Sequence, residues 1–354
     1  MVRRSNSLKI ITAIDSFKGC LSSAEANQTA AEGILSAYPH AEVVQIPVSD
    51  GGEGWLEAFS QTLGGSTVEL TVADPLMRPV RACYLLRGDT AVVEIAQASG
   101  LTLLTSEERN PLRTTSYGTG QLIAHAVKNG ATHIIVGLGG SATSDCGRGM
   151  LQALQDAFLP TPIVNVRFTL ASDVTNPLCG PQGAAHIFAP QKGATPEMVT
   201  ILDEQARQFA EESARKMGYD CQNQPGAGAA GGLGYAFLQY LHAACRPGIQ
   251  LLLEAIHFDE LLKGTSLVIT GEGRADAQTL MGKLPSGILK VAQAQGIPTI
   301  LLAGSVSDKE TLLQAGFYRV EGINPPGLPL EEALKKKVAQ GNLIATVERL
   351  LLSL

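Results

Sequence analysis

Four short segments of this sequence combine glycine with charged side chains in a way that suits phosphate chemistry. They are residues 15–19, 49–54, 139–145 and 271–276. Glycine lets backbone N–H groups approach a phosphate at a helix N-terminus, while Asp and Glu can hold Mg²⁺ or position a hydroxyl group. Phosphoryl transfer needs both beside a cation. The repetition of this combination favours nucleotide chemistry.

Each feature also has a structural interpretation. Asp50 or Asp145 would be an ordinary N-cap of the helix that follows it. Lys18 and Lys283 would reach phosphates as point charges or would be solvated surface residues. Arg274 would either pair with its acidic neighbours or bind a substrate carboxylate through two hydrogen bonds. Their recurrence at several strand ends favours the functional interpretation without deciding each residue.

Several other chemistries fit the sequence poorly. No Gly-x4-Gly-Lys-Ser/Thr string occurs, which excludes the ordinary P-loop kinases. The G-x-G-x-x-G match at Gly226–Gly231 follows polar, turn-like residues instead of a strand, so close helix packing or a lobe junction explains it better than a dinucleotide. A nucleophile elbow around Ser141 would need glycine at position 143, which is Thr. The six histidines show no zinc-ligand spacing.

Composition predicts a globular cytoplasmic protein of two lobes. The chain has 354 residues, which exceeds the usual size of one hydrophobic core. Its 33 acidic and 27 basic residues give a formal charge of −6, so we expect no nucleic-acid partner. Six scattered cysteines suggest reduced thiols in the cytosol. No stretch approaches the roughly 18 apolar residues of a membrane helix, so we expect no membrane partner.

Strand-like apolar runs alternate with helical periodicity, which is typical of an α/β protein. Five strands are predicted: residues 8–14, 42–48, 132–137, 266–270 and 297–303. Each precedes a polar or glycine-rich loop and then a helix. We therefore expect the loops to gather at the carboxyl edge of one parallel sheet.

Two regions depart from this pattern and predict an inserted lobe. In the first region, apolar and polar residues alternate around Val68, Leu70 and Val72, and two short strand-like runs flank Gly88-Asp89. This pattern predicts an antiparallel piece. Residues 160–264 hold a long helix that starts near Thr195-Pro196 and then the glycine cluster. We therefore assign residues 1–63, 115–158 and 261–354 to one domain, and 64–114 and 159–260 to the inserted α/β domain.

The exact strings of these loops resemble type 1 glycerate kinases over nearly the whole chain. The strings are Asp15-Ser-Phe-Lys-Gly, Asp50-Gly-Gly-Glu-Gly, Arg109-Asn-Pro-Leu, Tyr117-Gly-Thr-Gly, Gly139-Gly-Ser-Ala-Thr, Asp173-Val-Thr-Asn-Pro-Leu, Pro190-Gln-Lys-Gly, Gly226-Ala-Gly-Ala-Ala-Gly-Gly and Gly271-Glu-Gly-Arg. The resemblance implies a flavodoxin-like parallel-sheet domain interrupted by a second α/β domain. It also implies that ATP and Mg²⁺ serve as cosubstrates and that D-glycerate is phosphorylated to 2-phosphoglycerate.

The sequence departs from the family pattern next to several motifs. Ser144 stands where Asn is expected, Cys146 where Gly is expected, Trp55 for Thr and Gln121 for Glu. The stretch after Leu154 is also shorter than in relatives, which affects lobe closure and oligomer contacts more than chemistry.

Together, the residues and the resemblance predict Mg-assisted phosphoryl transfer in a cleft between the lobes. The catalytic candidates are Asp50, Asp145, Asp173, Asp276 and Lys18, of which Asp50, Asp145 and Asp276 are the candidate Mg²⁺ ligands. The candidates for binding substrate or nucleotide are Ser16, Gly51, Gly52, Glu53, Gly139, Gly140, Ser141, Gly271, Glu272, Arg274 and Lys283.

Two other functions stay open at this point. A nicotinamide-dependent oxidoreductase of hydroxy acids depends on the Gly226–Gly231 match alone. A sugar-acid sensor without turnover would retain the fold. The expected partners are small molecules, with a homodimer as an open alternative.

Overall fold

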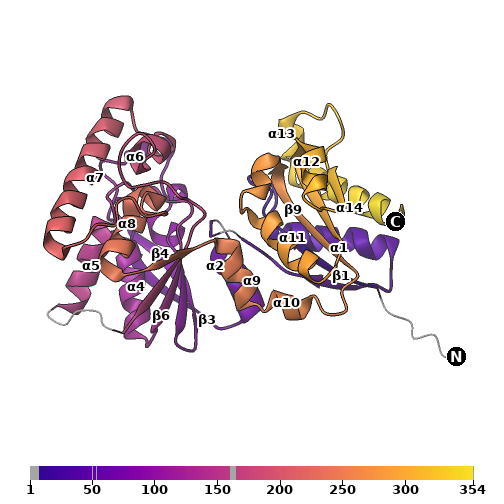
Figure 1. Cartoon of the computed structure of the whole chain (residues 1–354), viewed down its shortest axis with the longest axis horizontal. Helices are drawn as coiled ribbons and strands as arrows, with labels where there is room; N and C mark the ends of the chain where they lie inside the picture. Colours follow the sequence, from indigo (N-terminus) through magenta and orange to yellow (C-terminus); the bar gives the residue numbers. More distant parts are fainter. Residues whose placement is uncertain (1–7, 50, 53, 160–164, 354) are drawn as a thin grey trace. The chain divides into compact units, whose positions relative to one another are not determined.

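The computed structural model describes residues 8–49, 51–52, 54–159 and 165–353. The chain forms two compact units (Figure 1). Unit 1 comprises Met1–Asp50 and Ile249–Leu354, and unit 2 comprises Gly51–Gly248. The prediction of two α/β lobes, one inserted into the other, is thereby confirmed.

Unit 1 is built on a five-stranded, all-parallel sheet. Its strands are β1 (Lys9–Ile14), β2 (Glu42–Gln45), β9 (Leu267–Ala275), β10 (Thr299–Val306) and β11 (Arg319–Gly322). They lie in the order β2-β1-β9-β10-β11. Numbered within the unit, this is the 2-1-3-4-5 order of flavodoxin-like sheets, as the sequence led us to expect.

Helices cover both faces of this sheet. They are α1 (Ser23–Ala37), α9 (Gly248–Ala255), α10 (Phe258–Leu261), α11 (Leu284–Ala294), α12 (Lys309–Gln314), α13 (Leu330–Ala333) and α14 (Lys336–Leu351), with the 3₁₀ turn η4 (Ala277–Leu280). Successive side chains of a strand point to opposite faces. Accordingly, Ile300 and Leu302 of β10 pack with α1 and α14, whereas Leu301 and Ala303 pack towards α11 and α12.

The start of α1 follows from local sequence. The Ser22 hydroxyl accepts a hydrogen bond from the Glu25 amide, and the Glu25 carboxylate accepts one from the Ser22 amide. This capping box satisfies two of the N–H groups that a helix start leaves unpaired. It fixes the direction in which the chain leaves the loop after β1.

Unit 2 contains a six-stranded mixed sheet. Its strands are β3 (Ser66–Ala73), β4 (Pro79–Arg87), β5 (Thr90–Glu94), β6 (His133–Gly137), β7 (Arg167–Ala171) and β8 (Ala244–Arg246), and they are neighbours in sequence order. β3, β4 and β5 pair antiparallel, while β5 through β8 pair parallel. The predicted antiparallel piece with a turn at Gly88-Asp89 is confirmed.

The helices of unit 2 are α2 (Trp55–Leu63), α3 (Ala96–Ser99), α4 (Tyr117–Lys128), α5 (Arg148–Phe158), α6 (Ala184–Phe188), α7 (Pro196–Met217) and α8 (Ala229–Leu241), with the 3₁₀ turns η1 (Leu101–Leu103), η2 (Ser106–Glu108) and η3 (Pro190–Lys192). α4, α5 and α8 pack on the sheet through Leu122, Leu154 and Phe237. α7 starts at the predicted Thr195-Pro196 cap.

The structure corrects the predicted assignment of one strand. The predicted strand at residues 132–137 corresponds to β6 (His133–Gly137), which pairs with β5 and β7 in unit 2 and not with the sheet of unit 1. The division of the chain therefore differs from the predicted boundaries, because residues 115–158 belong to unit 2 together with 64–114. The loop after β6, with Gly139, Ser141 and Asp145, accordingly does not lie on the same sheet as Lys18 and Glu272.

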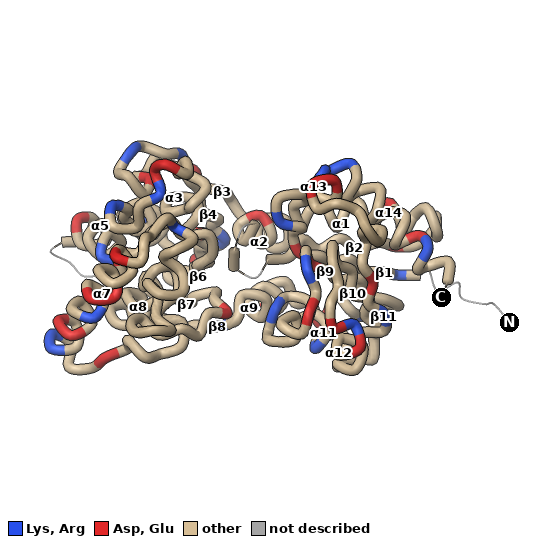
Figure 2. The backbone as a smooth tube through the Cα atoms, turned by 90° about the horizontal axis from the view of Figure 1, so that it is seen from above, with Lys and Arg blue, Asp and Glu red and all other residues tan. Residues whose placement is uncertain are grey.

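Two further properties concern the whole chain. Acidic and basic residues are interspersed along both units (Figure 2). Within the described ranges, no helix is both long enough and apolar enough to cross a membrane.

Candidate active-site residues of the two units

The strand order of unit 1 reverses between β1 and β9, and such a switch point is where open α/β sheets bind ligands. The loop after β1 lies beside the last residues of β9. The Asp15 amide donates to the Gly271 carbonyl at 2.9 Å. The sheet therefore brings residues 15–19 and 271–276 to one edge, although Gly271 to Ala275 continue β9 instead of forming the predicted loop.

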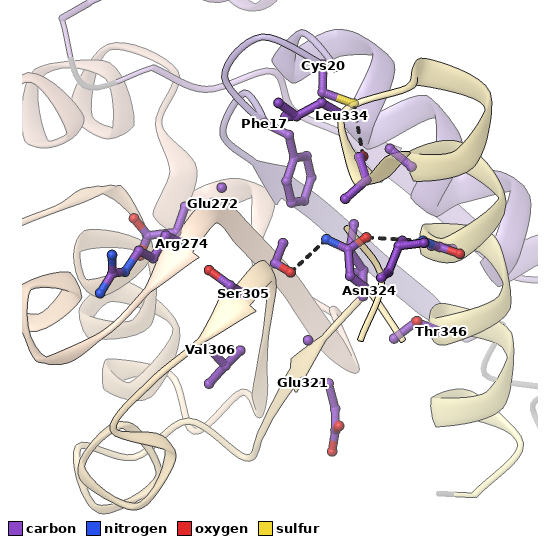
Figure 3. Close-up of a pocket in the computed structure, with 18 of the residues that line it drawn as sticks. Phe17, Cys20, Glu272, Arg274, Ser305, Val306, Glu321, Asn324, Leu334 and Thr346 are labelled. Atoms are coloured by element: carbon purple, nitrogen blue, oxygen red, sulfur yellow. Dashed lines mark hydrogen bonds between the residues drawn. The ribbon is translucent and has the colours of Figure 1, made fainter. Parts of the chain in front are cut away.

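A cavity of about 1300 Å³ lies at this edge of unit 1 (Figure 3). The loops after β1, β9, β10 and β11 line it together with α13 and α14. Its lining includes Asp15, Ser16, Phe17, Lys18, Glu272, Arg274, Lys283, Ser305, Asn324, Leu334 and Asn342. The cavity can hold a large ligand, since typical small-molecule sites measure about 300–1,000 Å³.

Several cationic side chains line the cavity. Lys18 is exposed in the loop after β1. Lys283 occupies the N-cap position of α11, and its Nζ lies 4.0 Å from Glu272 Oε2. Arg274 Nε lies 3.4 Å from Asp276 Oδ2. Lysine and a helix N-terminus both favour negative charge, so the cavity suits phosphate groups.

Two carboxamides and several apolar side chains also line the cavity. Asn342 Nδ2 donates to Asn324 Oδ1 at 3.1 Å, and Asn324 Nδ2 donates to the Gly304 carbonyl at 2.9 Å. Phe17 and Leu334 lie beside these amides (Figure 3). Sequence reasoning missed Asn324 and Asn342, because neither lies in a glycine-rich string.

Asp276 lies in unit 1 but serves as a cap. Its Oδ1 accepts from the Gln278 amide at 2.9 Å, and its own amide donates to Thr279 Oγ1 at 3.1 Å. Thr279 in turn donates to Glu272 Oε1 at 2.6 Å. Asp276 is not among the described residues that line the cavity. The Asp276 carboxylate therefore caps η4, and the Asp276 amide helps to position Glu272 through Thr279.

In unit 2, parallel strands β5, β6 and β7 bring a second group of residues to one edge. Glu94, Gly137 and Ala171 form the last row of the ladder. The segment at Gly51 crosses this edge, where the Gly139 amide donates to the Gly51 carbonyl at 3.0 Å. A Cβ on Gly139 would lie only 2.3 Å from Gly52 Cα, so glycine is required for this approach.

The structure thus brings Gly51, Gly52, Gly139, Gly140 and Ser141 together. Asp173 is exposed two residues beyond the end of β7, at the same edge. Asp50 and Glu53 lie outside the described residues. Glu94, a buried carboxylate at the end of β5, was missed, although an acid directly after the apolar run 91–93 was a usable signal.

Asp145 is held by the protein itself. Its Oδ2 accepts from the Ser116 amide and hydroxyl, both at 2.8 Å, and from the Gly149 amide at 3.1 Å. Its Oδ1 accepts from the Gly147 amide at 3.1 Å. These bonds tie the start of α5 to the start of α4. Gly147 and not Asp145 is the N-cap of α5, but the Asp145 carboxylate accepts from the first turn of that helix and so has a structural role.

The glycine cluster of unit 2 is a packing device. Ala230, Gly231 and Gly232 have positive φ and interrupt the start of α8. A Cβ on Gly231 would lie 2.0 Å from the Thr143 carbonyl oxygen, and one on Gly228 would lie 2.3 Å from the Pro177 carbonyl oxygen. Turns precede the motif instead of a strand. The close packing expected from its sequence context explains the motif.

The described residues contain no group of three or more His, Cys, Asp or Glu side chains that could hold a metal ion. Mg²⁺ in kinases usually takes only one or two protein carboxylates, with substrate phosphates and waters as its other ligands. Asp15 and Glu272 both line the cavity of unit 1. Their hard oxygen donors fit such an ion.

Comparisons with known proteins agree on one family. The model of the glycerate kinase family matches residues 10–161 and 157–354. Glycerate kinase of Bacillus subtilis (strain 168) is 42% identical over 93% of this chain and 93% of its own length. The chain belongs to the glycerate kinase family.

Two more relatives extend the comparison. Glycerate 2-kinase of Escherichia coli (strain K12) is 40% identical over 85% of this chain and 86% of its own. The crystal structure of putative glycerate kinase 2 from Salmonella typhimurium LT2 matches with a TM-score of 0.82 and 37% identity, covering 98% of both chains. Family membership identifies the chain as a kinase, and the match over both units confirms the fold class.

Proposed function

We propose that this kinase transfers the γ-phosphoryl group of ATP to the C2 hydroxyl of D-glycerate, giving 2-phosphoglycerate. The observation that carries the proposal is the large cavity at the switch point of unit 1, in a chain that belongs to the glycerate kinase family. The choice of C2 rests on the Escherichia coli relative, which is named glycerate 2-kinase.

The cavity of unit 1 is the proposed ATP site. Phe17 and the paired amides of Asn324 and Asn342 offer a stacking surface and hydrogen-bonding groups for a base. Lys18 and Lys283 offset the charge of the phosphates. Catalysis of phosphoryl transfer consists mainly of such positioning and charge stabilisation, because little covalent chemistry falls to the protein.

Unit 2 supplies the residues proposed for the acceptor end of the reaction. The hydroxyl oxygen of glycerate attacks the γ-phosphorus, the bond to the ADP oxygen breaks, and a carboxylate takes up the hydroxyl proton. Asp173, exposed at the carboxyl edge of β7, is our candidate for orienting that hydroxyl, and Asp50 stays a second candidate. The 139–141 backbone would cradle anionic oxygens.

Mg²⁺ is proposed as part of the reaction. When bound, it supplies positive charge that neutralises the phosphate oxygens. Asp15 and Glu272 are the described carboxylates that would hold it. Of the earlier candidates, neither Asp145 nor Asp276 is among the described residues that line the cavity.

The cysteines and the glycine motif bear on the cellular location and on the two alternative functions. All six cysteines are free thiols, which suits the proposed cytoplasmic location. The oxidoreductase alternative loses its only support, because the Gly226–Gly231 motif packs a helix against a loop. The sensor alternative differs from the proposal only in turnover.

The test is a coupled ADP-release assay with ATP, Mg²⁺ and D-glycerate. We expect release that depends on all three, and a higher KM for ATP in Lys18→Met. Glycerate binding without ADP release, in folded protein, would favour the sensor. ADP release that Lys18→Met leaves unchanged would contradict the assignment of the cavity.

A further inference from the structure

Lys192 is a buried lysine to which the proposed reaction assigns no role. It ends η3 in unit 2, and only 2% of the residue is exposed. Lysine is among the residues least often buried, since removing an ammonium group from water is costly. A fully buried lysine at the edge of a candidate site therefore requires an explanation.

The Lys192 amine is bound to the loop after β6. Its Nζ donates to Ser141 Oγ at 2.8 Å and to the Thr143 carbonyl at 2.6 Å. No carboxylate of the described residues lies within ion-pair distance of it. Burial lowers the pKa of Lys192 to about 7, with the negative charge of Asp145 opposing the shift. The amine is thus held in place without a neutralising partner.

This arrangement determines what the Ser141 hydroxyl can do. A serine hydroxyl has one proton to donate and can accept up to two hydrogen bonds. Because Ser141 Oγ accepts from Lys192, its own proton must point elsewhere. No acceptor for that proton exists among the described residues. Ser141 lies at the carboxyl edge of the sheet, where the Gly139 and Gly51 backbones meet.

Neighbouring polar atoms also lack partners. Thr143 Oγ1, Ser144 Oγ and Arg109 Nε are buried without a hydrogen bond. Thr143 and Ser144 are wholly or more than nine-tenths buried in the same loop. Arg109 belongs to the segment against which Gly193 packs, since a Cβ on Gly193 would lie 2.4 Å from the Arg109 carbonyl oxygen. Buried polar groups in native proteins normally find partners, and a bound ligand would supply them.

We propose that Lys192 is a positioning residue that fixes the 141–143 loop and directs the Ser141 hydroxyl proton towards an anionic oxygen of the bound substrate. The proposal rests on the proposed function for the identity of that substrate. The shared chemistry is an oxyanion, which either a phosphate of the nucleotide or the carboxylate of glycerate can provide. Lys192 contributes positive charge behind the hydroxyl and thereby strengthens the bond that it donates.

The arrangement also makes anion binding depend on pH. The protonated amine can only donate, which keeps the Ser141 proton free for the ligand, whereas a neutral amine can accept that proton. Anion binding therefore selects the protonated amine and is stronger below pH 7 than above it. The charged group that acts on Lys192 is Asp145, from the loop after β6. Asp145 is already held by five hydrogen bonds from protein donors.

The first experiment compares Ser141→Ala, Lys192→Met and the double variant in steady-state kinetics. Methionine keeps the length of the lysine side chain and removes its charge. We expect each variant to lose roughly 10- to 100-fold in kcat/KM, the scale of a charge-assisted hydrogen bond. The double variant should lose no more than the worse single one, since both act through one bond. Lys216→Met, an exposed lysine of α7, is the matched control for loss of a charge.

The substrate whose KM rises identifies the source of the oxyanion. A rise for ATP assigns it to the nucleotide, and a rise for D-glycerate assigns it to the carboxylate. Kinetics of Ser141→Ala that equal the wild type would overturn the proposal. So would additive losses in the double variant, because they would mean that Lys192 does not act through Ser141.

A second readout does not depend on turnover. Sulfate keeps its charge across neutral pH, and its binding to the full chain can be followed through the fluorescence of Trp55, the single tryptophan, which packs beside Gly137. We expect tighter sulfate binding at pH 6 than at pH 8.5 in the wild type, and no such difference in Lys192→Met. If no kinase activity is found but this pH dependence is present, the proposed function fails and the inference stands. Binding that neither pH nor Lys192→Met alters overturns it.

Discussion

Replacing Lys192 with methionine should change how the stability of unit 2 depends on pH. The pKa of Lys192 lies at about 7 in the folded protein and at its ordinary 10.5 in the unfolded chain. Between these values the unfolded chain binds a proton that the folded protein does not. Stability therefore rises with pH in this window, as the unfolded state loses its proton advantage. Below about pH 7 both states are protonated, and the full cost of the buried charge applies.

The size of this change in stability follows from the difference between the folded and unfolded pKa values of Lys192. Each pH unit within the window corresponds to about 1.4 kcal/mol. From pH 7.5 to 9.5 the wild type should therefore gain about 2.7 kcal/mol relative to Lys192→Met. Lys192 is fully buried, so solvent screening reduces this value little. The variant also leaves the Thr143 carbonyl without its donor, at a cost of roughly 1–3 kcal/mol. That cost does not depend on pH, so it shifts the difference without altering its slope.

The assay is urea denaturation at several pH values, followed by the fluorescence of Trp55. This residue is fully buried in unit 2 and therefore reports on the unit that contains Lys192. Urea is preferred because it leaves electrostatic interactions unscreened. Lys216→Met, which removes an exposed charge, should follow the wild type within about 0.5 kcal/mol at every pH.

A flat difference between the wild type and Lys192→Met from pH 7.5 to 9.5 would refute this reasoning. It would mean that the folded protein keeps the amine protonated, which would require an anionic partner. A difference that falls with rising pH would be equally contradictory, because it would reverse the sign of the linkage.

Three further predictions concern other residues. Gly139→Ala should lower the free energy of unfolding of unit 2 by about 2 kcal/mol or more, because its Cβ would meet Gly52 Cα at 2.3 Å. Gly341→Ala in α14, where a Cβ meets open space, should instead raise the free energy of unfolding by about 0.5–1 kcal/mol. Equal effects of the two substitutions in urea denaturation would contradict the close approach at Gly139. Lys18→Met should raise the KM for ATP roughly 10- to 100-fold with little change for D-glycerate, and a selective effect on D-glycerate would place the nucleotide elsewhere. Asp145→Asn should destabilise unit 2 by roughly 1–3 kcal/mol while both KM values stay near wild type; lost turnover in a variant of full stability would show that Asp145 acts in catalysis and not as a structural residue.

Features of the fold that depend on neighbouring residues could be predicted from the sequence. The proline start of α7 was found, because it involves contacts within one helical turn. The place of residues 132–137 could not be found in this way. Periodicity identifies a strand, but the sheet it joins depends on pairing with β5 and β7. The predicted domain boundaries therefore differed from the observed units.

The residues of the candidate site also divide into those with a local sequence signal and those without one. Glycine-rich strings identified the loops at both sheet edges, because close backbone approach leaves a local signal. Lys192 was missed, since its partner Ser141 lies 51 residues away and a lysine before glycine carries no signal of burial. The sequence left Asp145 as either catalytic or capping. Only its five hydrogen bonds, from Thr115, Ser116, Gly147 and Gly149, supplied the geometry.

The most direct test of the central claim is phosphorus NMR of a reaction of the purified chain with ATP, Mg²⁺ and D-glycerate, run to completion. The account predicts ADP and 2-phosphoglycerate as the phosphorus-containing products. Formation of 3-phosphoglycerate would contradict the assignment of the acceptor hydroxyl. ATP left unconsumed by folded protein would contradict the proposed activity itself.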